Sequence, residues 1–381
     1  MKRFLYCCIL LFSLGCKERY PLPQDMPPTG FLVVEGVVNS AGISTIILTK
    51  SLKLVDSFSV SYIRGALIRI ESKDNTIYPL NETGIGIYTS ANLNLNAAQE
   101  YRLYIRVPGG KEYRSDYRPV KKTPAISSIS WERTNGVSIY ANTRDPQNST
   151  KYYRWEYDET YEFNSPFETS LKYQINPANG KATVVFRDPT TRNADRSIFK
   201  CWKNSFSQTI DILSTAKLSE DTTHYRLLTI PPAAKQLSIL YSINVKQYAL
   251  SQEGFEYLSK MKKNTEQTGS IFDAQPSQLR GNIHCLSDDN EMVIGFLEVS
   301  NVLTKRIFIS SQDVPGWGYR HPCSHMELLN NPDTISTYGF PTPTLPVEMA
   351  NDVVKIFGAT SDLSCVDCTV LGTNVKPTFW P

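Results

Sequence analysis

The sequence predicts a mainly β protein, with an N-terminal immunoglobulin-like β-sandwich followed by a larger β-rich domain that carries one or two helices. Three observations lead to this fold class. The chain has 21 Tyr, 16 Phe and 5 Trp against 6 Met, and aromatic residues favour pleated, half-exposed surfaces. Apolar residues recur with period two in short runs bounded by turn residues, the pattern of strands. Only one segment, after Ser251, has the period of an amphipathic helix.

Length and charge exclude several classes of protein. The 381 residues are enough for two or three domains. The 40 Lys and Arg against 37 Asp and Glu give a net charge of +3, too balanced for binding to phosphate backbones by bulk charge, so we expect no nucleic-acid partner. A hydrophobic content of 41% excludes a disordered chain. The lack of an 18-residue apolar run after residue 16 excludes a polytopic membrane protein.

Residues 1–15 have the pattern of a lipoprotein signal peptide. Met-Lys-Arg precedes an apolar stretch that ends at residue 14, which is too short to cross a hydrocarbon core of about 30 Å. Ser-Leu-Gly-Cys at positions 13–16 resembles a bacterial lipobox, whose cysteine is acylated and becomes the first residue after cleavage. We therefore expect Cys16 to carry the lipid that anchors the protein to a membrane. The alternative is an ordinary signal peptide with a cysteine nearby.

Residues 16–30 are predicted to form a lipid-anchored, proline-rich tether. Four prolines fall within residues 21–28, and such a density of proline favours an extended, polyproline-like chain. The tether would hold the folded body away from the membrane.

The first domain is predicted over residues 31–120. Its β-branched runs at 31–38 and 44–49 are separated by Asn-Ser-Ala-Gly, and the runs at 101–107 and 111–115 are separated by Pro-Gly-Gly, so each pair reads as a hairpin. Shorter strands fit residues 66–70, 76–78 and 86–88. About seven short strands in some ninety residues favour an immunoglobulin-like sandwich.

The second domain is predicted over residues 121–381. Strands are expected at residues 126–131, 137–140, 151–157, 226–230, 237–247, 292–300 and 306–309. The polar segment 164–196 is expected to be a long surface excursion. Ser251 is expected to cap a helix that carries Phe255, Leu258 and Met261 on one face. From Pro315 onward we expect cysteine-containing loops.

The predicted folded body contains five cysteines, Cys201, Cys285, Cys323, Cys365 and Cys368. Outside the cytoplasm we expect up to two disulfides with one thiol left over, and the sequence leaves their connectivity open. A second interpretation is a metal site formed by His321, Cys323, Cys365 and Cys368, because zinc binds Cys and His tetrahedrally.

Catalytic signatures are missing from the sequence. It contains no G-x-S-x-G elbow, P-loop, dinucleotide fingerprint or H-E-x-x-H, so we expect neither an enzyme nor a cofactor. Glu156 and Glu162, in an acidic run, are the candidates for the carboxylate pair of a glycan hydrolase. Trp317, Tyr319 and Arg320 are candidates for an exposed platform that binds a sugar or peptide. The alternative is that these aromatic residues pack their loop onto the body.

Several segments together resemble one protein family. They are the lipobox, residues 31–36 (Phe-Leu-Val-Val-Glu-Gly), residues 201–213, the strand at 241–247, residues 270–273 with 281–283, and the tail from Cys365-x-x-Cys368 to Lys-Pro-Thr-Phe-Trp at 376–380. In this order they resemble the DUF4249 family of Bacteroidota lipoproteins over nearly the whole chain. The resemblance implies an outer-membrane lipoprotein that works beside a TonB-dependent β-barrel receptor in the uptake of a nutrient. It implies no catalytic residues and no particular ligand.

The leading hypothesis is therefore a non-enzymatic outer-membrane lipoprotein, exposed at the cell surface, that acts as accessory or substrate-binding partner of a TonB-dependent transporter. An unknown nutrient would be its ligand. One alternative is a surface adhesin or structural interaction module, and another is a glycan hydrolase.

Overall fold

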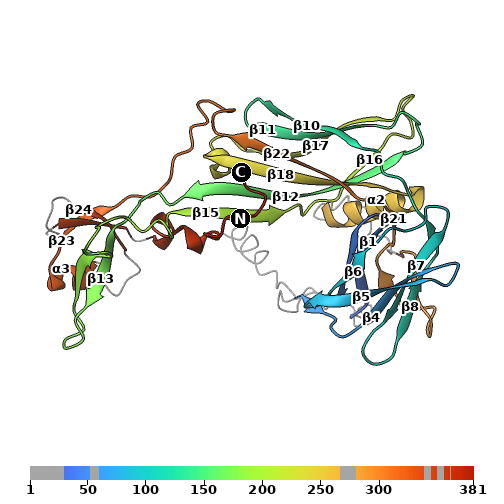
Figure 1. Cartoon of the computed structure of the whole chain (residues 1–381), viewed down its shortest axis with the longest axis horizontal. Coiled ribbons are helices and arrows are strands. Elements are labelled where there is room, and N and C mark those ends of the chain that lie inside the picture. Colours follow the sequence, from blue (N-terminus) through green and yellow to red (C-terminus); the bar gives the residue numbers. More distant parts are fainter. Residues whose placement is uncertain (1–29, 52–59, 267–279, 339–344, 350–355, 361) are drawn as a thin grey trace, which may run out of the picture.

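The computed structural model describes residues 30–51, 60–266, 280–338, 345–349, 356–360 and 362–381. The signal peptide, Cys16 and residues 17–29 of the tether lie outside the described residues. The described chain is mainly β, as predicted, and is elongated, with a first body, a second body and a distal module in a row (Figure 1). Within the described part, no helix has the length and apolar character needed to cross a membrane.

The first body is a twelve-stranded sheet around one hydrophobic core. Its sheet order is β19-β8-β7-β4-β5-β6-β2-β1-β20. Three short strands lie off this path: β21 pairs with β1, β3 pairs with β2, and β9 pairs with β7. The end strands β19 and β20 contact each other, so the sheet wraps around the core. The strands are β1 (Leu32–Asn39), β2 (Ile43–Lys50), β3 (Ser61–Tyr62), β4 (Leu67–Ser72), β5 (Ile77–Gly84), β6 (Ile87–Asn92), β7 (Glu100–Arg106), β8 (Glu112–Ser115), β9 (Arg118–Pro119), β19 (Ile283–Cys285), β20 (Val293–Ile294) and β21 (Val299–Ser300).

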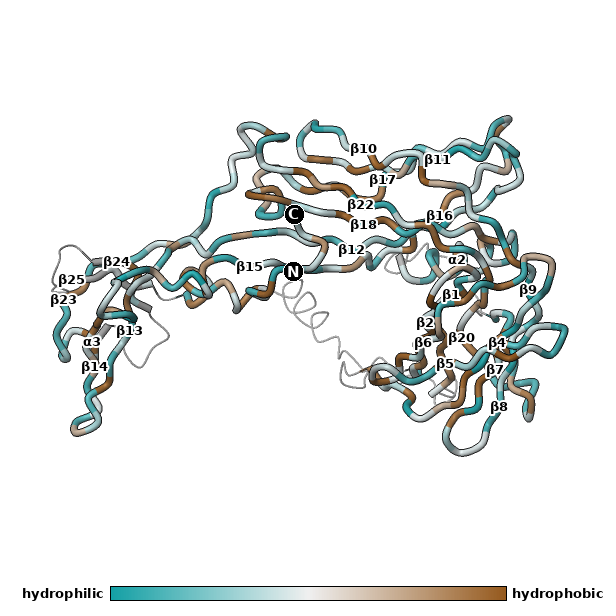
Figure 2. The backbone as a smooth tube through the Cα atoms, in the orientation of Figure 1, coloured by the Kyte–Doolittle hydropathy of each residue, from teal (hydrophilic) through white to brown (hydrophobic). Residues whose placement is uncertain are grey.

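Strand β1 illustrates how the period-two pattern forms this core. Leu32, Val34 and Val38 are buried, whereas Val33 and Glu35 point to the opposite face of the sheet. Both predicted hairpins are present, between β1 and β2 and between β7 and β8. Hydrophobic stretches follow the strands, and the connecting loops at the outside of the molecule are mostly hydrophilic (Figure 2).

The first body also contains residues that the sequence placed in the second domain. Strand β19 pairs with β8, and β20 and β21 pair in parallel with β1. This corrects the assignment of residues 292–300 to the second domain. Strands of two or three residues are too short to show a period, and a tertiary contact holds them in place. Asn282 accepts from the Leu297 N–H (2.7 Å) and donates to the Leu297 carbonyl (3.0 Å).

The second body packs two sheets face to face around a second core. The three-stranded sheet has the order β10-β11-β17, and the five-stranded sheet has the order β15-β12-β18-β22, with β16 also paired to β12. Its elements are β10 (Ile126–Arg133), β11 (Val137–Arg144), β12 (Tyr152–Asn164), β15 (Lys200–Phe206), β16 (Asp211–Ser214), β17 (Thr222–Ile230), η1 (Lys235–Leu237), β18 (Leu240–Ala249) and β22 (Leu303–Ser310).

Trp155 lies at the centre of this second core and is fully buried. Its ring stacks on Tyr153 and Tyr225, with centroid distances of 5.7 and 4.7 Å. Its Nε1–H donates to the side-chain oxygen of Gln247 (2.8 Å), and Gln247 donates in turn to the Pro124 carbonyl (2.8 Å). The buried amide of Gln247 therefore satisfies the indole N–H of Trp155. It also holds Pro124, which lies in the segment that links the two bodies.

The distal module corrects two loop predictions. Residues 164–196, expected to be an irregular excursion, contain the hairpin of β13 (Leu171–Ile175) and β14 (Ala182–Phe186). The chain after Pro315, expected to be loops, contains β23 (Met326–Leu329), α3 (Pro332–Tyr338), β24 (Leu345–Met349), β25 (Ile356–Thr360), η2 (Leu363–Cys365) and η3 (Cys368–Val370). Leu171 and Val184 of the hairpin share a small core with Leu328 and Ile335. This core exists only where the two distant segments meet, so neither segment shows a strong pattern alone.

Candidate binding groove between the two bodies

A groove of about 1050 Å³ lies between the first body, helix α2 (Gln252–Glu266) and the five-stranded sheet of the second body. The first body contributes β1, β2 and β6, and the second body contributes β12, β18 and β22. Figure 1 shows α2 between the two bodies, where it forms one wall. The volume is at the upper end of the roughly 300–1,000 Å³ that is usual for small-molecule sites.

The first body presents an apolar surface to this groove. Val33 and Val37 of β1, Ile47 of β2 and Ile87 of β6 line it with the face of the sheet that points away from the core. An antiparallel sheet with one covered face normally has polar residues on the other. The apolar outer face therefore indicates a surface that a ligand or another protein surface covers.

The rim of the groove carries two further exposed apolar side chains. Ile43 is 59% exposed and Phe206 is 68% exposed. Exposed apolar residues that gather beside a cavity are typical of binding sites.

Helix α2 begins where the sequence predicted. Ser251 Oγ accepts from the backbone N–H of Gly254 (3.0 Å), which is an N-cap interaction. Leu258 and Met261 line the groove as two members of the predicted apolar face. Phe255, the third, instead packs against Tyr152 at a centroid distance of 5.1 Å.

Glu298 fixes the start of the helix against the first body. Its Oε1 accepts from the Ser251 N–H (3.0 Å) and hydroxyl (2.5 Å). A Cβ at Gly254 would lie 2.0 Å from the same oxygen, so the close approach requires glycine there. Burial raises the pKa of Glu298, and its donors at Ser251 counteract part of that effect. This carboxyl group is therefore occupied in positioning the helix.

The second body presents a polar wall. Arg154 and Glu156 on β12 lie directly opposite Tyr248 and Lys246 on β18, so the four side chains share one face of the sheet. The Tyr248 hydroxyl donates to Glu156 Oε2 (2.6 Å), and Arg154 donates to the other carboxylate oxygen. Burial, followed by the charge of Glu156, raises the pKa of Tyr248, which therefore stays protonated.

Lys246 has no hydrogen-bond or ion-pair partner in the described part of the chain, although its side chain is half-buried. It lines the groove beside Thr304 of β22. On the opposite wall, Glu35 also has no ion-pair partner among the described residues, but this side chain is exposed to water.

The predicted platform of Trp317, Tyr319 and Arg320 does not form. Trp317 is only 9% exposed, and its Nε1–H donates to the Ala234 carbonyl (2.7 Å). Tyr319 packs half-buried against the same core, and only Arg320 is exposed. The alternative interpretation is therefore correct: the aromatic residues pack the loop onto the second body.

The two candidate hydrolase carboxylates, Glu156 and Glu162, lie on the same strand, six residues apart. At about 3.3 Å per residue this separation is about 20 Å, whereas the carboxylates of a glycosidase lie about 5–10 Å apart. Glu162 also accepts from Lys200 (2.6 Å) and from the indole N–H of Trp380 (2.9 Å). The pair therefore does not have the geometry for glycoside cleavage.

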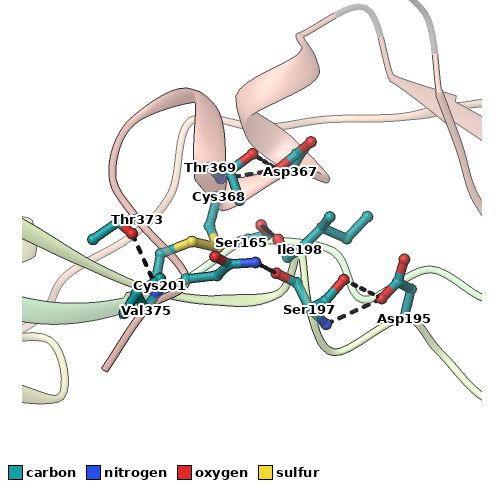
Figure 3. Close-up of a disulfide and its surroundings, with 11 residues drawn as sticks. Ser165, Asp195, Ser197, Ile198, Cys201, Asp367, Cys368, Thr369, Thr373 and Val375 are labelled. Atoms are coloured by element: carbon teal, nitrogen blue, oxygen red, sulfur yellow. Dashed lines mark hydrogen bonds between the residues drawn. A yellow bond between two sulfur atoms is a disulfide. The ribbon is translucent and has the colours of Figure 1, made fainter. Parts of the chain in front are cut away.

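Four of the five candidate cysteines form disulfides, Cys201–Cys368 and Cys323–Cys365, with Cα separations of 5.7 and 5.9 Å. Cys285 is buried and unpaired, as expected for an odd number. Figure 3 shows the first bond, which joins β15 to η3. The tail beyond it is held by two backbone hydrogen bonds between Trp202 and Thr373 (2.8 and 2.9 Å).

The alternative metal site is overturned by the same bonds. Cys323, Cys365 and Cys368 are all in disulfides and cannot act as thiolate ligands. The ring of His321 lies against Phe167 at 5.8 Å. Within the ranges described above, no group of three or more His, Cys, Asp or Glu residues is placed to hold a metal ion.

The groove and its polar residues are not apparent from the sequence. Arg154 and Lys246 occur in strands that were predicted, and Tyr248 directly follows the predicted strand 237–247, but which face they occupy depends on the pairing of β12 with β18. The only local signal was the strand around residues 151–157, whose large side chains alternate on both faces.

Together, the fold and the groove define a mainly β protein of several sheets, with a ligand-sized groove between two bodies and a disulfide-bonded C-terminal segment. A family model described as "Domain of unknown function (DUF4249)" matches residues 18–306. The chain belongs to this family. No curated protein matches it.

Several solved structures resemble parts of the chain. One is a DUF4785 family protein from Legionella pneumophila, 7% identical with a TM-score of 0.20, over 57% of this chain and 52% of that one. The match thus spans about half of the Legionella protein. A two-domain fibronectin type III segment of chicken tenascin is 12% identical with a TM-score of 0.17, over 59% and 92% of the two chains. The B domain of a biofilm associated protein is 9% identical with a TM-score of 0.17, over 75% and 89%. Scores of this size do not indicate a shared function.

Proposed function

We propose that this protein is a lipid-anchored outer-membrane protein of Bacteroidota, facing the outside of the cell, that binds a nutrient in the groove between its two bodies. It acts beside a TonB-dependent transporter, which takes up that nutrient. The groove of about 1050 Å³ is the observation that carries the proposal. It combines an apolar surface with a few polar groups, the composition that is usual for small-molecule sites.

The sequence supports the location. The lipobox-like segment at residues 13–16 and the proline-rich tether are consistent with a body attached to a membrane by Cys16. The two disulfides suit an oxidising compartment outside the cytoplasm. The resemblance to lipoproteins that accompany TonB-dependent receptors suggests the β-barrel partner.

Co-purification tests the proposal. Tagged protein is extracted from membranes in mild detergent, from cells grown on several nutrients, and its partners are identified by mass spectrometry. We expect a TonB-dependent β-barrel in at least one growth condition.

The Cys16→Ala variant is the matched control, and we expect it to leave the outer-membrane fraction and lose the barrel partner. Wild-type protein that brings down no barrel under any condition would overturn the proposed partnership. Protein that incorporates no labelled palmitate and stays in the soluble fraction would overturn the anchor.

A further inference from the structure

We infer that the groove binds an organic monocarboxylate with a bulky apolar body, with its anionic group held at Lys246. This inference rests on the proposed function, because it names the chemical class of the nutrient.

Five charged side chains line the groove: Glu35, Arg154, Glu156, Lys246 and Glu298. Arg154 and Glu156 neutralise each other through a direct ion pair. Glu298 is buried and accepts hydrogen bonds from the backbone N–H and the hydroxyl of Ser251, so it is not available to a ligand. Glu35 is exposed and solvated at the first body. Only Lys246 combines partial burial with the lack of a partner in the described part of the chain.

Lys246 lines the groove, and its ammonium group has no hydrogen-bond or ion-pair partner in the described part of the chain. A ligand anion would supply the missing interaction, as opposite charges do for buried ions in general. Glu156 lies directly across the strand pair from Lys246. Because Arg154 neutralises Glu156, Lys246 leaves one unpaired positive charge on this wall, which a carboxylate with a single charge matches better than a dianion such as a phosphate monoester.

The rest of the groove specifies the body of the ligand. Val33, Val37, Ile47 and Ile87 form the wall of the first body, and Leu258 belongs to the wall formed by α2. A sugar would leave these apolar walls facing hydroxyl groups. An acyl chain or a fused-ring skeleton buries them, and each buried methylene contributes about 0.8 kcal/mol by the area it removes from water.

The chain from residue 16, with Cys16→Ser so that no acyl group is attached, is the protein for the test. Cis-parinaric acid, a fluorescent polyene fatty acid, serves as the probe. Palmitate and cholate compete as chain-bodied and ring-bodied carboxylates, and hexadecanol and hexadecyltrimethylammonium serve as neutral and cationic counterparts. We expect at least one of the two carboxylates to displace the probe, and which one does so distinguishes an acyl from a ring body.

Lys246→Met keeps most of the side-chain length and removes the charge. We expect it to weaken cis-parinarate binding about tenfold or more, the effect of losing one charge-assisted hydrogen bond, and to leave hexadecanol binding unchanged. Lys217→Met is the matched control, because Lys217 is exposed and does not line the groove. Leu258→Trp should narrow the groove at its apolar wall and weaken binding, whereas Leu218→Trp, at a site away from the groove that is 53% exposed, should not.

Two results would overturn the inference even if the groove binds ligands. One is equal affinity of Lys246→Met and wild type for cis-parinarate. The other is tighter binding of hexadecyltrimethylammonium than of the carboxylates. Unchanged binding in a correctly folded Leu258→Trp variant would place the ligand elsewhere and overturn it too. If no carboxylate binds but the β-barrel co-purifies, the inference fails and the proposed partnership stands. If the carboxylate binds as described and no barrel is recovered, the partnership fails instead.

Discussion

The disulfide between Cys201 and Cys368 should be a major source of stability for the second body. Both cysteines are fully buried, and the bond joins β15 to the C-terminal segment. The perturbation is the double variant Cys201→Ala and Cys368→Ala. We expect it to retain the fold with a clearly reduced free energy of unfolding.

The magnitude follows from the size of the loop that the bond closes. The bond joins residues 167 positions apart. While Cys323–Cys365 is intact, a shorter path of about 125 residues connects the same two cysteines across that second bond, and a loop of this size corresponds to about 5 kcal/mol on the chain-entropy model. Measured effects of single disulfides are often about 2–4 kcal/mol, so the expected loss lies between about 2 and 5 kcal/mol.

The assay is urea unfolding without reductant, followed by tryptophan fluorescence. Trp202 adjoins the bond, and Trp380 is buried in the tail that the bond holds, with its indole N–H on Glu162 (2.9 Å). Cys285→Ala is the control, because it removes a buried thiol without removing a crosslink. The reasoning is refuted if the double variant unfolds at the same urea concentration as this control.

Three further predictions concern the core, the helix cap and one buried carboxylate. Trp155→Ala should lower the free energy of unfolding by about 3–5 kcal/mol, measured by urea denaturation; a loss no larger than that of the half-buried Trp131→Ala would contradict the assigned core. Ser251→Ala removes the N-cap and should lower the free energy of unfolding by about 1 kcal/mol. It should also speed amide hydrogen exchange at the start of α2. Ser259→Ala, within the helix, should have neither effect. Burial by itself raises the pKa of Asp145, but donors from Thr150, Gln147 and Ser149 lower it to about 2. The carboxylate therefore contributes stability that is present above the unfolded pKa of about 4 and is lost as the pH falls toward about 2. The urea midpoint should depend less on pH in this acidic range for Asp145→Asn than for wild type, and equal slopes would count against the assignment.

Local structure was readable from local sequence. Alternating apolar residues marked the strands of the first body, and Asn-Ser-Ala-Gly and Pro-Gly-Gly marked two hairpins that the structure contains. The cap at Ser251 marked the start of α2. An odd number of cysteines indicated at least one free thiol, but not that it would be Cys285.

The groove and the distal module could not be predicted from local sequence patterns. Residues of β1 and β18 that face each other across the groove are more than two hundred positions apart. The hairpin of β13 and β14 becomes a folded unit only through its contact with residues near Leu328 and Ile335. The aromatic loop at Trp317 shows the same difficulty, because composition cannot distinguish an exposed platform from a packed one.

By itself, then, the sequence determined the mainly β class, the principal strands, the main helix and the number of cysteines in the folded body. The physical reason is that side-chain periodicity, turn chemistry and helix capping act over a few residues. Only the tertiary structure decided which cysteines pair, which short strands complete the first sheet and which charge in the groove has no partner among the described residues. Those properties depend on contacts between residues far apart in the chain, and no local pattern encodes them.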